Sequence, residues 1–246
     1  MITAAGNAPP IDAQPASVLR RAAAWGVHAY TASGAVIAFL AFAAIGEQRF
    51  ADVFRWLGVA FAIDCSDGAL ARAVGVKRVL PYYDGARLDD IIDYLTYVMV
   101  PVVLLYEAGF FPAGHETWIA AAPLLASAYG FCRSDAKTGD HYFRGFPSYW
   151  NVVAFYAYAL RISPEVTAVW VLILSLLVFA PLKFLYPSRA PRFRALSLGL
   201  GAVWAVVMTY AVWTLPETPS FLIWASLAYP AYYCGMSFWL QATRRA

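Results

Sequence analysis

Charge is the first thing that this sequence lacks. Only 13% of its 246 residues are Asp, Glu, Lys or Arg, while 61% are hydrophobic; soluble domains carry about 25% charged residues. The net charge of +3 is too small for a protein that binds nucleic acid through a basic surface. The composition therefore excludes an ordinary soluble domain and predicts an integral membrane protein.

Cysteine pairs and a cleavable leader are lacking too. Cys65, Cys132 and Cys234 are odd in number, have no CxxC spacing and lie in apolar segments, so we expect small core residues and neither disulfides nor soft-metal ligands. Residues 1–15 are rich in Pro and Ala and lack the charged and apolar regions of a signal peptide. We expect a disordered leader there, followed by a single membrane-embedded domain over residues 16–246.

Long apolar runs occupy most of the remaining chain. They cover residues 27–46, 51–73, 89–109, 117–133, 147–162, 165–187, 194–214 and 219–241. A helix needs about 20 residues to cross a bilayer. The sequence therefore predicts an all-α, polytopic helix bundle with about eight transmembrane helices, and seven or six stay open if residues 147–187 form fewer spans.

The basic residues favour one orientation of this bundle. With the N-terminus inside, all 18 Lys and Arg residues except Arg49, Arg55 and Arg161 fall on the cytoplasmic side. This bias predicts that both termini are cytoplasmic. Residues 17–25, with Arg20 and Arg21, fit either a short juxtamembrane helix in the headgroup plane or a flanking topology signal.

Four aspartates interrupt the apolar segments: Asp64 and Asp67 in the second, and Asp89 and Asp93 in the third. A charge at the bilayer centre costs roughly 2.5–3.5 kcal/mol on insertion scales. Residues three or four apart share one face of a helix, and in the predicted topology both pairs face each other at the cytoplasmic end. Carboxylate oxygens suit Mg²⁺, Mn²⁺ or Ca²⁺, so we expect these acids to hold cations.

The neighbours of the first acid pair are suited to a phosphate ligand. Gly68 and Ala71 leave room on the same helix face, and Arg72 offers a planar fork for phosphate oxygens. The alternative is that the acids only form salt bridges with nearby basic residues, as Asp84 and Asp90 plausibly do. Salt bridges do not require small residues at helical spacing, so we favour a ligand site.

At this point the pattern resembles a known signature. Asp64-x2-Asp67-Gly68-x2-Ala71-Arg72 followed by Gly85-x3-Asp89-x3-Asp93 is similar to the motif of the CDP-alcohol phosphotransferases. The family usually has eight residues between the Ala-Arg pair and the second glycine, whereas this chain has twelve, residues 73–84. This longer spacer resembles that of the bacterial members that use choline. So do residues 28–34, 76–85, 88–101 and 137–151.

The resemblance implies a set of roles. Two divalent cations, Mn²⁺ or Mg²⁺, would bind Asp64, Asp67, Asp89 and Asp93, with Asp93 also the general base. Contacts to CDP would come from Gly68, Ala71, Arg72 and Gly85, with Thr31 and Ser33 at the pocket wall. The implied reaction transfers the phosphatidyl group of CDP-diacylglycerol to choline and releases CMP, in the bacterial inner membrane with the site facing the cytoplasm. Family members are often homodimers, so we expect a homodimer here.

The aromatic residues bear on the identity of the acceptor. Choline is a quaternary ammonium, which aromatic side chains bind well, and we expect contacts from Tyr149, Trp150 and Asn151, with Arg144 near the headgroup. Tyr and Trp also gather at membrane interfaces without binding anything. Serine, glycerol phosphate or inositol phosphate stay open as acceptors. A cation transporter is a remote alternative, because six of the 15 acids crowd into residues 64–93 and do not spread across the membrane.

Overall fold

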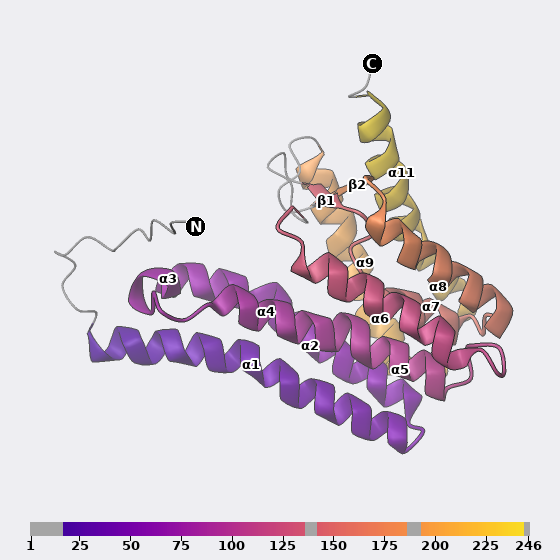
Figure 1. Cartoon of the computed structure of the whole chain (residues 1–246), viewed down its shortest axis with the longest axis horizontal. Helices are drawn as coiled ribbons and strands as arrows, with labels where there is room; N and C mark the ends of the chain where they lie inside the picture. Colours follow the sequence, from indigo (N-terminus) through magenta and orange to yellow (C-terminus); the bar gives the residue numbers. More distant parts are fainter. Residues whose placement is uncertain (1–16, 136–141, 186–192, 244–246) are drawn as a thin grey trace, which may run out of the picture.

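A computed structural model describes residues 17–135, 142–185 and 193–243, and it is mostly helical (Figure 1). The predicted leader lies outside these residues. The helices are α1 (Val18–Gly46), α2 (Phe50–Val74), α3 (Val76–Val79), α4 (Gly85–Asp93), the π-helix η1 (Tyr94–Met99), α5 (Val100–Glu107), α6 (Glu116–Cys132), α7 (Trp150–Ala159), α8 (Pro164–Phe179), α9 (Arg194–Thr214), α10 (Ser220–Ser226) and α11 (Ala228–Thr243). The strands are β1 (Tyr142–Arg144) and β2 (Lys183–Leu185).

Each of the eight predicted segments contains helix, and the third continues through α4, η1 and α5. The segment predicted over residues 165–187 is too long, because α8 ends at Phe179 and Pro181 cannot continue it. Lys183–Leu185 instead pairs antiparallel with Tyr142–Arg144. The all-α prediction therefore holds for the described chain apart from this two-stranded sheet.

Two of the described helices, α1 and α9, are long and apolar enough to cross a membrane. By contrast, α7 has ten residues and rises only about 15 Å, which is half of the roughly 30 Å hydrocarbon core. The number of spans and the positions of the termini stay predictions. From Val18 on, the 17–25 segment is part of α1, which continues to Gly46 without a break.

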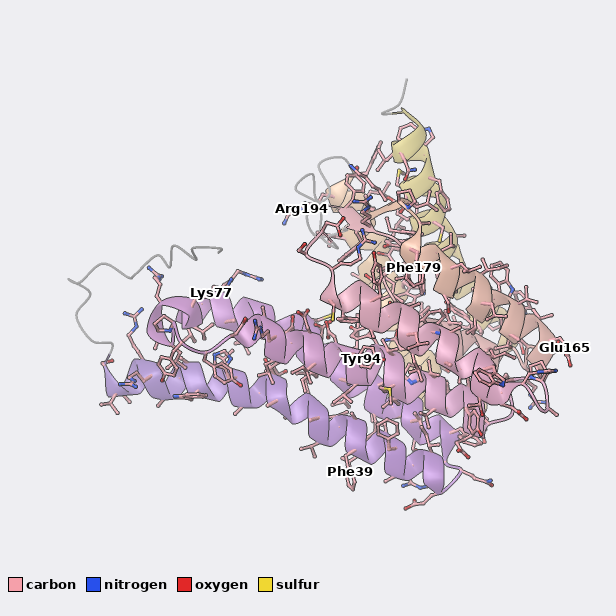
Figure 2. The ribbon with its side chains drawn as sticks, in the orientation of Figure 1. Phe39, Lys77, Tyr94, Glu165, Phe179 and Arg194 are labelled. Carbon is pink, nitrogen blue, oxygen red and sulfur yellow. The ribbon has the colours of Figure 1, made fainter. Side chains whose placement is uncertain are left out.

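Large apolar side chains cover much of the outer surface. Phe39 projects from α1 away from the other helices and is 68% exposed (Figure 2), and Val206 on α9 is 70% exposed. Proteins that fold in water rarely expose large apolar patches. The three cysteines are free. All three are exposed, so the prediction that they are small core residues is wrong.

Helices α1 and α2 lie side by side, and α4 packs on α1 (Figure 1). The approach of α4 depends on Gly34: a Cβ atom at this position would lie 2.4 Å from Cγ2 of Ile92. Gly34 thus allows a close contact within one chain. Such small residues can also serve contacts between subunits, but this one is occupied by α4.

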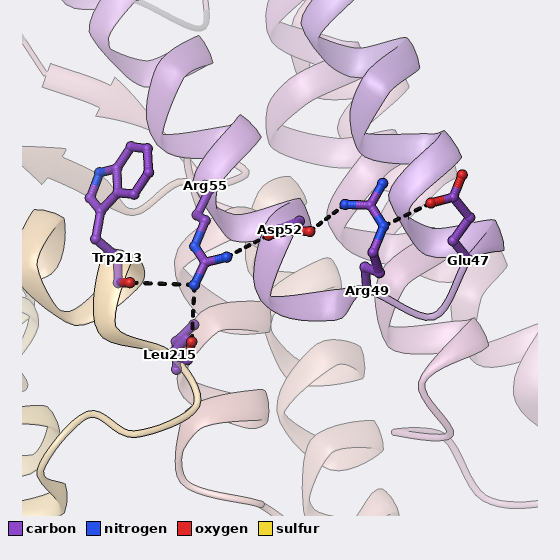
Figure 3. Close-up of polar contacts among 6 residues, drawn as sticks. All are labelled: Glu47, Arg49, Asp52, Arg55, Trp213 and Leu215. Atoms are coloured by element: carbon purple, nitrogen blue, oxygen red, sulfur yellow. Dashed lines mark hydrogen bonds and ion pairs between the residues drawn. The ribbon is translucent and has the colours of Figure 1, made fainter.

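A polar network joins the α1–α2 turn to the end of α9 (Figure 3). Arg49 pairs with both Glu47 and Asp52, and Asp52 also accepts a hydrogen bond of 2.5 Å from Arg55. The Arg55 guanidinium donates to the carbonyl oxygens of Trp213, at 3.3 Å, and Leu215, at 3.1 Å. A cation is favourable there, because the last carbonyls of a helix carry partial negative charge.

Candidate metal centre and active site

The turn between α2 and α4 fixes the position of the second acid pair. Gly75 ends α2 in the left-handed conformation, with φ of 73°, which glycine adopts without strain. Asp84 begins α4 by accepting hydrogen bonds from the amides of Ala86 and Arg87, and its side chain also pairs with Arg87 at 3.2 Å, as the salt-bridge interpretation predicts.

The additional spacer residues form a helical turn between these two points. Helix α3 has four residues, which equals the excess over the usual eight-residue spacer. Val76, Val79 and Leu80 are buried in a small cluster with Ala24 and Val27 of α1. The longer spacer is therefore packed against α1.

Gly85, the first residue of α4, lies directly against α1. A Cβ atom here would be 2.6 Å from Cε1 of His28. His28 is itself buried, and its ring lies 4.4 Å from that of Tyr83, centroid to centroid. Glycine is thus required at this position for α4 to approach α1.

Three of the four predicted acids converge. Asp64 from α2 and Asp89 and Asp93 from α4 each offer a carboxylate oxygen, and these atoms all lie within 4.8 Å of one another. The Tyr97 hydroxyl donates a 2.8 Å hydrogen bond to Oδ2 of Asp64. Oxygen ligands at this spacing suit a hard divalent cation, so this cluster could bind a metal.

Asp67 is the fourth predicted acid and lies outside this group of three. It is buried, and its Oδ2 accepts a 2.8 Å hydrogen bond from the Thr31 hydroxyl of α1. Thr31 thus contacts the motif directly, and its predicted role in CDP binding stays a prediction. The Ser33 hydroxyl instead donates to the carbonyl oxygen of Tyr30 within α1, at 2.6 Å.

The predicted nucleotide contacts on α2 differ in their surroundings. Space beside Gly68 is limited only by Arg72, whose Nη1 would lie 3.3 Å from an added Cβ atom. Arg72 is exposed, so its guanidinium lies over the glycine while remaining accessible. Ala71 packs against the cluster beneath α3. Gly68 and Arg72 thus form a positively charged face of α2 that is open to a ligand, whereas Ala71 packs towards α3.

A cavity of about 1160 Å³ extends from Asp64, Asp89 and Asp93. Tyr149 and Asn151, two of the predicted choline contacts, line it. Trp150 is not among the lining residues. It is fully buried, and its indole N–H donates to the Ser127 hydroxyl at 2.7 Å. Helix α9 and the aromatic residues Tyr97, Tyr229 and Tyr233 form further parts of the lining.

Comparison with known proteins identifies relatives of this chain. It is 38% identical to a phosphatidylcholine synthase of Pseudomonas aeruginosa over 224 residues, covering 91% of the chain and 94% of the relative. It is 42% identical to that of Rhizobium meliloti, covering 89% and 90%, and 39% identical to that of Legionella pneumophila, covering 88% of each. The chain belongs to the bacterial phosphatidylcholine synthase family. No family model matches the chain. Membership supports a transferase of phospholipid synthesis, in line with the resemblance to choline-using enzymes.

In this member of the phosphatidylcholine synthase family, the basic residues that line the described cavity form ion pairs with aspartates. Arg144 on β1 lines the cavity and contacts Asp135 at 2.6 Å. Arg133 donates two hydrogen bonds to the same carboxylate, at 2.7 and 2.9 Å. The hydrogen bonds from Arg133 lower the pKa of Asp135 to about 2, so the carboxylate is charged at neutral pH and forms ion pairs with both arginines. Lys137 and His141, which belong to the 137–151 segment that resembles the choline-using members, lie outside the described residues.

Sequence reasoning missed Tyr97 and Tyr233. Tyr97 had a local signal, because it follows Asp93 by four residues and so shares its side of the helix. Tyr233 lies on α11, far along the chain, and reaches the cavity only through tertiary packing. No pattern near Tyr233 in the sequence relates it to the aspartates.

Proposed function

We propose that the protein transfers the phosphatidyl group of CDP-diacylglycerol to choline, forming phosphatidylcholine and releasing CMP. This is CDP-alcohol phosphotransferase chemistry. The observation that carries the proposal is the convergence of Asp64, Asp89 and Asp93 at a large cavity in a member of this family. In the proposed orientation the site faces the cytoplasm, in the inner membrane.

The donor set fits divalent metal ions. Three carboxylates with oxygens within 4.8 Å are suited to Mg²⁺ or Mn²⁺, and we assign Asp67, one helical turn beyond Asp64, to the same ligand set. Two such ions would neutralise the pyrophosphate and the departing CMP. The Tyr97 hydroxyl orients the Asp64 carboxylate by its hydrogen bond, as residues behind metal ligands commonly do.

Asp93 acts as the general base in this proposal. Its carboxylate accepts the proton of the choline hydroxyl, and the choline oxygen forms a bond to the phosphorus that carries diacylglycerol. The bond from this phosphorus to the CMP oxygen breaks, and CMP leaves with the electron pair. The protein contributes mainly by holding the reactants in line and balancing charge, as is usual for phosphoryl transfer.

The nucleotide would lie along the open face of α2. In this proposal Gly68, Ala71 and Gly85 contact the CDP moiety, and Arg72 contacts phosphate oxygens. Thr31 and Ser33 complete the proposed wall from α1. The position of the Arg72 guanidinium above Gly68 supports this arrangement, because arginine binds phosphate through a planar pair of N–H groups.

The lipid chains would occupy the part of the cavity between α2 and α9. From Asp64 the lining continues along α2 past Gly58 to Arg55, nine residues or about 14 Å along the helix. Half of the hydrocarbon core is about 15 Å thick. The groove thus has the depth of one leaflet, and the exposed apolar side chains of α1 and α9 support a membrane setting. We retain a homodimer as part of the proposal.

Choline is favoured over anionic acceptors by the contacts of the basic residues at the cavity. Glycerol phosphate and inositol phosphate need several available basic side chains near the metals, whereas Arg133 and Arg144 are both engaged by Asp135. Choline, as a cation, would have the acid cluster on one side and the aromatic rings of the cavity on the other. Serine differs from choline in its negatively charged carboxylate, which these surroundings do not favour.

The test is a reconstitution of the purified protein with CDP-diacylglycerol. CMP release and lipid product are measured with choline, serine, glycerol phosphate or inositol phosphate, before and after chelation of divalent cations. We expect product only with choline and only with Mn²⁺ or Mg²⁺ restored. Product from another acceptor would refute the acceptor assignment, and activity that survives thorough chelation would refute the metal mechanism.

A further inference from the structure

Three tyrosines from distant elements meet in the cavity. They are Tyr97 on η1, Tyr149 at the start of α7 and Tyr233 on α11. The ring centroids of Tyr97 and Tyr149 are 6.3 Å apart, at an interplanar angle of 52°, and those of Tyr149 and Tyr233 are 6.4 Å apart, at 62°. Rings at such angles form the walls of a corner instead of a stack, so one small group can contact more than one of them.

This aromatic corner adjoins the acid cluster. The Tyr97 hydroxyl donates to Asp64 at 2.8 Å, and Tyr97 follows Asp93 by four residues in a continuous helix. That helix widens into a π-helix over Tyr94–Met99, in which hydrogen bonds run from residue i to i+5. Asp93 and Tyr97 both line the cavity, so the general base and the first tyrosine face the same space.

The chemistry of the corner fits a compact organic cation. Tyrosine faces carry negative electrostatic potential and attract a cation within about 6 Å of the ring centre. Quaternary ammonium groups carry no N–H, so aromatic faces suit them better than hydrogen-bond acceptors do. In choline the hydroxyl and the quaternary nitrogen are separated by two carbons, which matches a cation site adjacent to the base.

We propose that Tyr97, Tyr149 and Tyr233 form the cage that binds the trimethylammonium group of choline. The inference rests on the proposed function, and it changes our expectation for the pocket. Tyr149 remains a direct contact, whereas Trp150 supports the cage from the core through its hydrogen bond to Ser127. Tyr97 joins the cage to the metal ligands.

The test measures choline binding apart from turnover. Choline and its neutral isostere 3,3-dimethylbutan-1-ol are titrated calorimetrically into the whole protein in detergent with Mn²⁺. We expect choline to bind at least tenfold more tightly than the isostere, which has the same shape without the charge. Tyr149→Leu or Tyr233→Leu should weaken choline binding about tenfold, and Tyr149→Phe less than threefold, because phenylalanine keeps the ring face.

Matched controls keep the outcomes distinct. Tyr106→Leu removes an exposed ring from α5 that does not line the cavity, and choline binding should be unchanged. Equal binding of choline and the isostere, no choline binding at all, or leucine variants that bind like the parent would overturn the cage. Choline binding that depends on the tyrosines, without transfer from CDP-diacylglycerol, would support the cage and refute the proposed function instead.

Discussion

The spacing between α1 and α4 depends on a missing side chain at Gly34. In Gly34→Ala the new Cβ atom would lie 2.4 Å from Cγ2 of Ile92, whereas carbon atoms pack at about 3.5–4.0 Å. The Ile92 methyl group must therefore move by roughly 1 Å, and we expect α4 to move with it because Ile92 is buried. Ile92 directly precedes Asp93, so this shift moves Asp89 and Asp93 relative to Asp64. A misplacement of about 1 Å can cost about 100-fold in rate.

The assay compares CMP release by the parent and Gly34→Ala, with thermal unfolding measured on the same samples. We expect a loss near 100-fold in kcat and a destabilisation of about 1–3 kcal/mol from overpacking. Ile92→Ala removes the clashing methyl group, so Gly34→Ala with Ile92→Ala should be more active than Gly34→Ala alone. Gly26→Ala is the matched control on α1, because no atom lies within 4 Å of its added Cβ. Gly34→Ala activity within threefold of the parent, or no rescue by the second substitution, would refute the reasoning.

Three further predictions concern the site. Asp93→Asn should abolish phosphatidylcholine formation yet leave CDP binding within about threefold, measured by calorimetry; appreciable residual turnover would reject its role as base. Gly58→Phe should fill the groove between α2 and α9 and lower activity on long-chain donors more than on short-chain ones, as compared in a donor series; an equal loss on both would count against the groove. The low pKa of Asp135 means that its ion pairs stabilise the fold above the ordinary carboxyl pKa, and that this contribution disappears as pH falls towards about 2. The stability deficit of Asp135→Asn should thus be constant from pH 5 to 8 and shrink in acid, and a deficit that varies between pH 5 and 8 would contradict the assignment.

The helical segments and the acid cluster could be predicted because both are local signals. Apolar runs report burial or lipid contact residue by residue, and charged side chains inside such runs are costly enough to indicate a site. Asp64 and Asp89 lie on α2 and α4, which are joined through the short helix α3, so their convergence at one end of the bundle follows from the order of the helices. The signature motif then assigned chemistry that periodicity by itself does not.

The remaining features depend on contacts between distant parts of the chain. The pairing of β1 with β2 joins residues about 40 positions apart, and short strands next to apolar helices have no distinctive period. Trp150 and Tyr149 are adjacent in the sequence, yet one is in the core and the other faces the cavity. Local composition could not separate them, because both are large aromatic residues at a helix start.

The hydrogen bonds of Arg55 join α2 to the end of α9, at one end of the groove between the two helices. Because α2 and α9 are held together at this end, we expect them to separate at the opposite end. The product phosphatidylcholine would then leave the groove laterally into the membrane leaflet, at the end near the aspartates, and would not pass through water. Removing the hydrogen bonds of Arg55 should therefore change the rate of product release and leave the rate of phosphatidyl transfer unchanged.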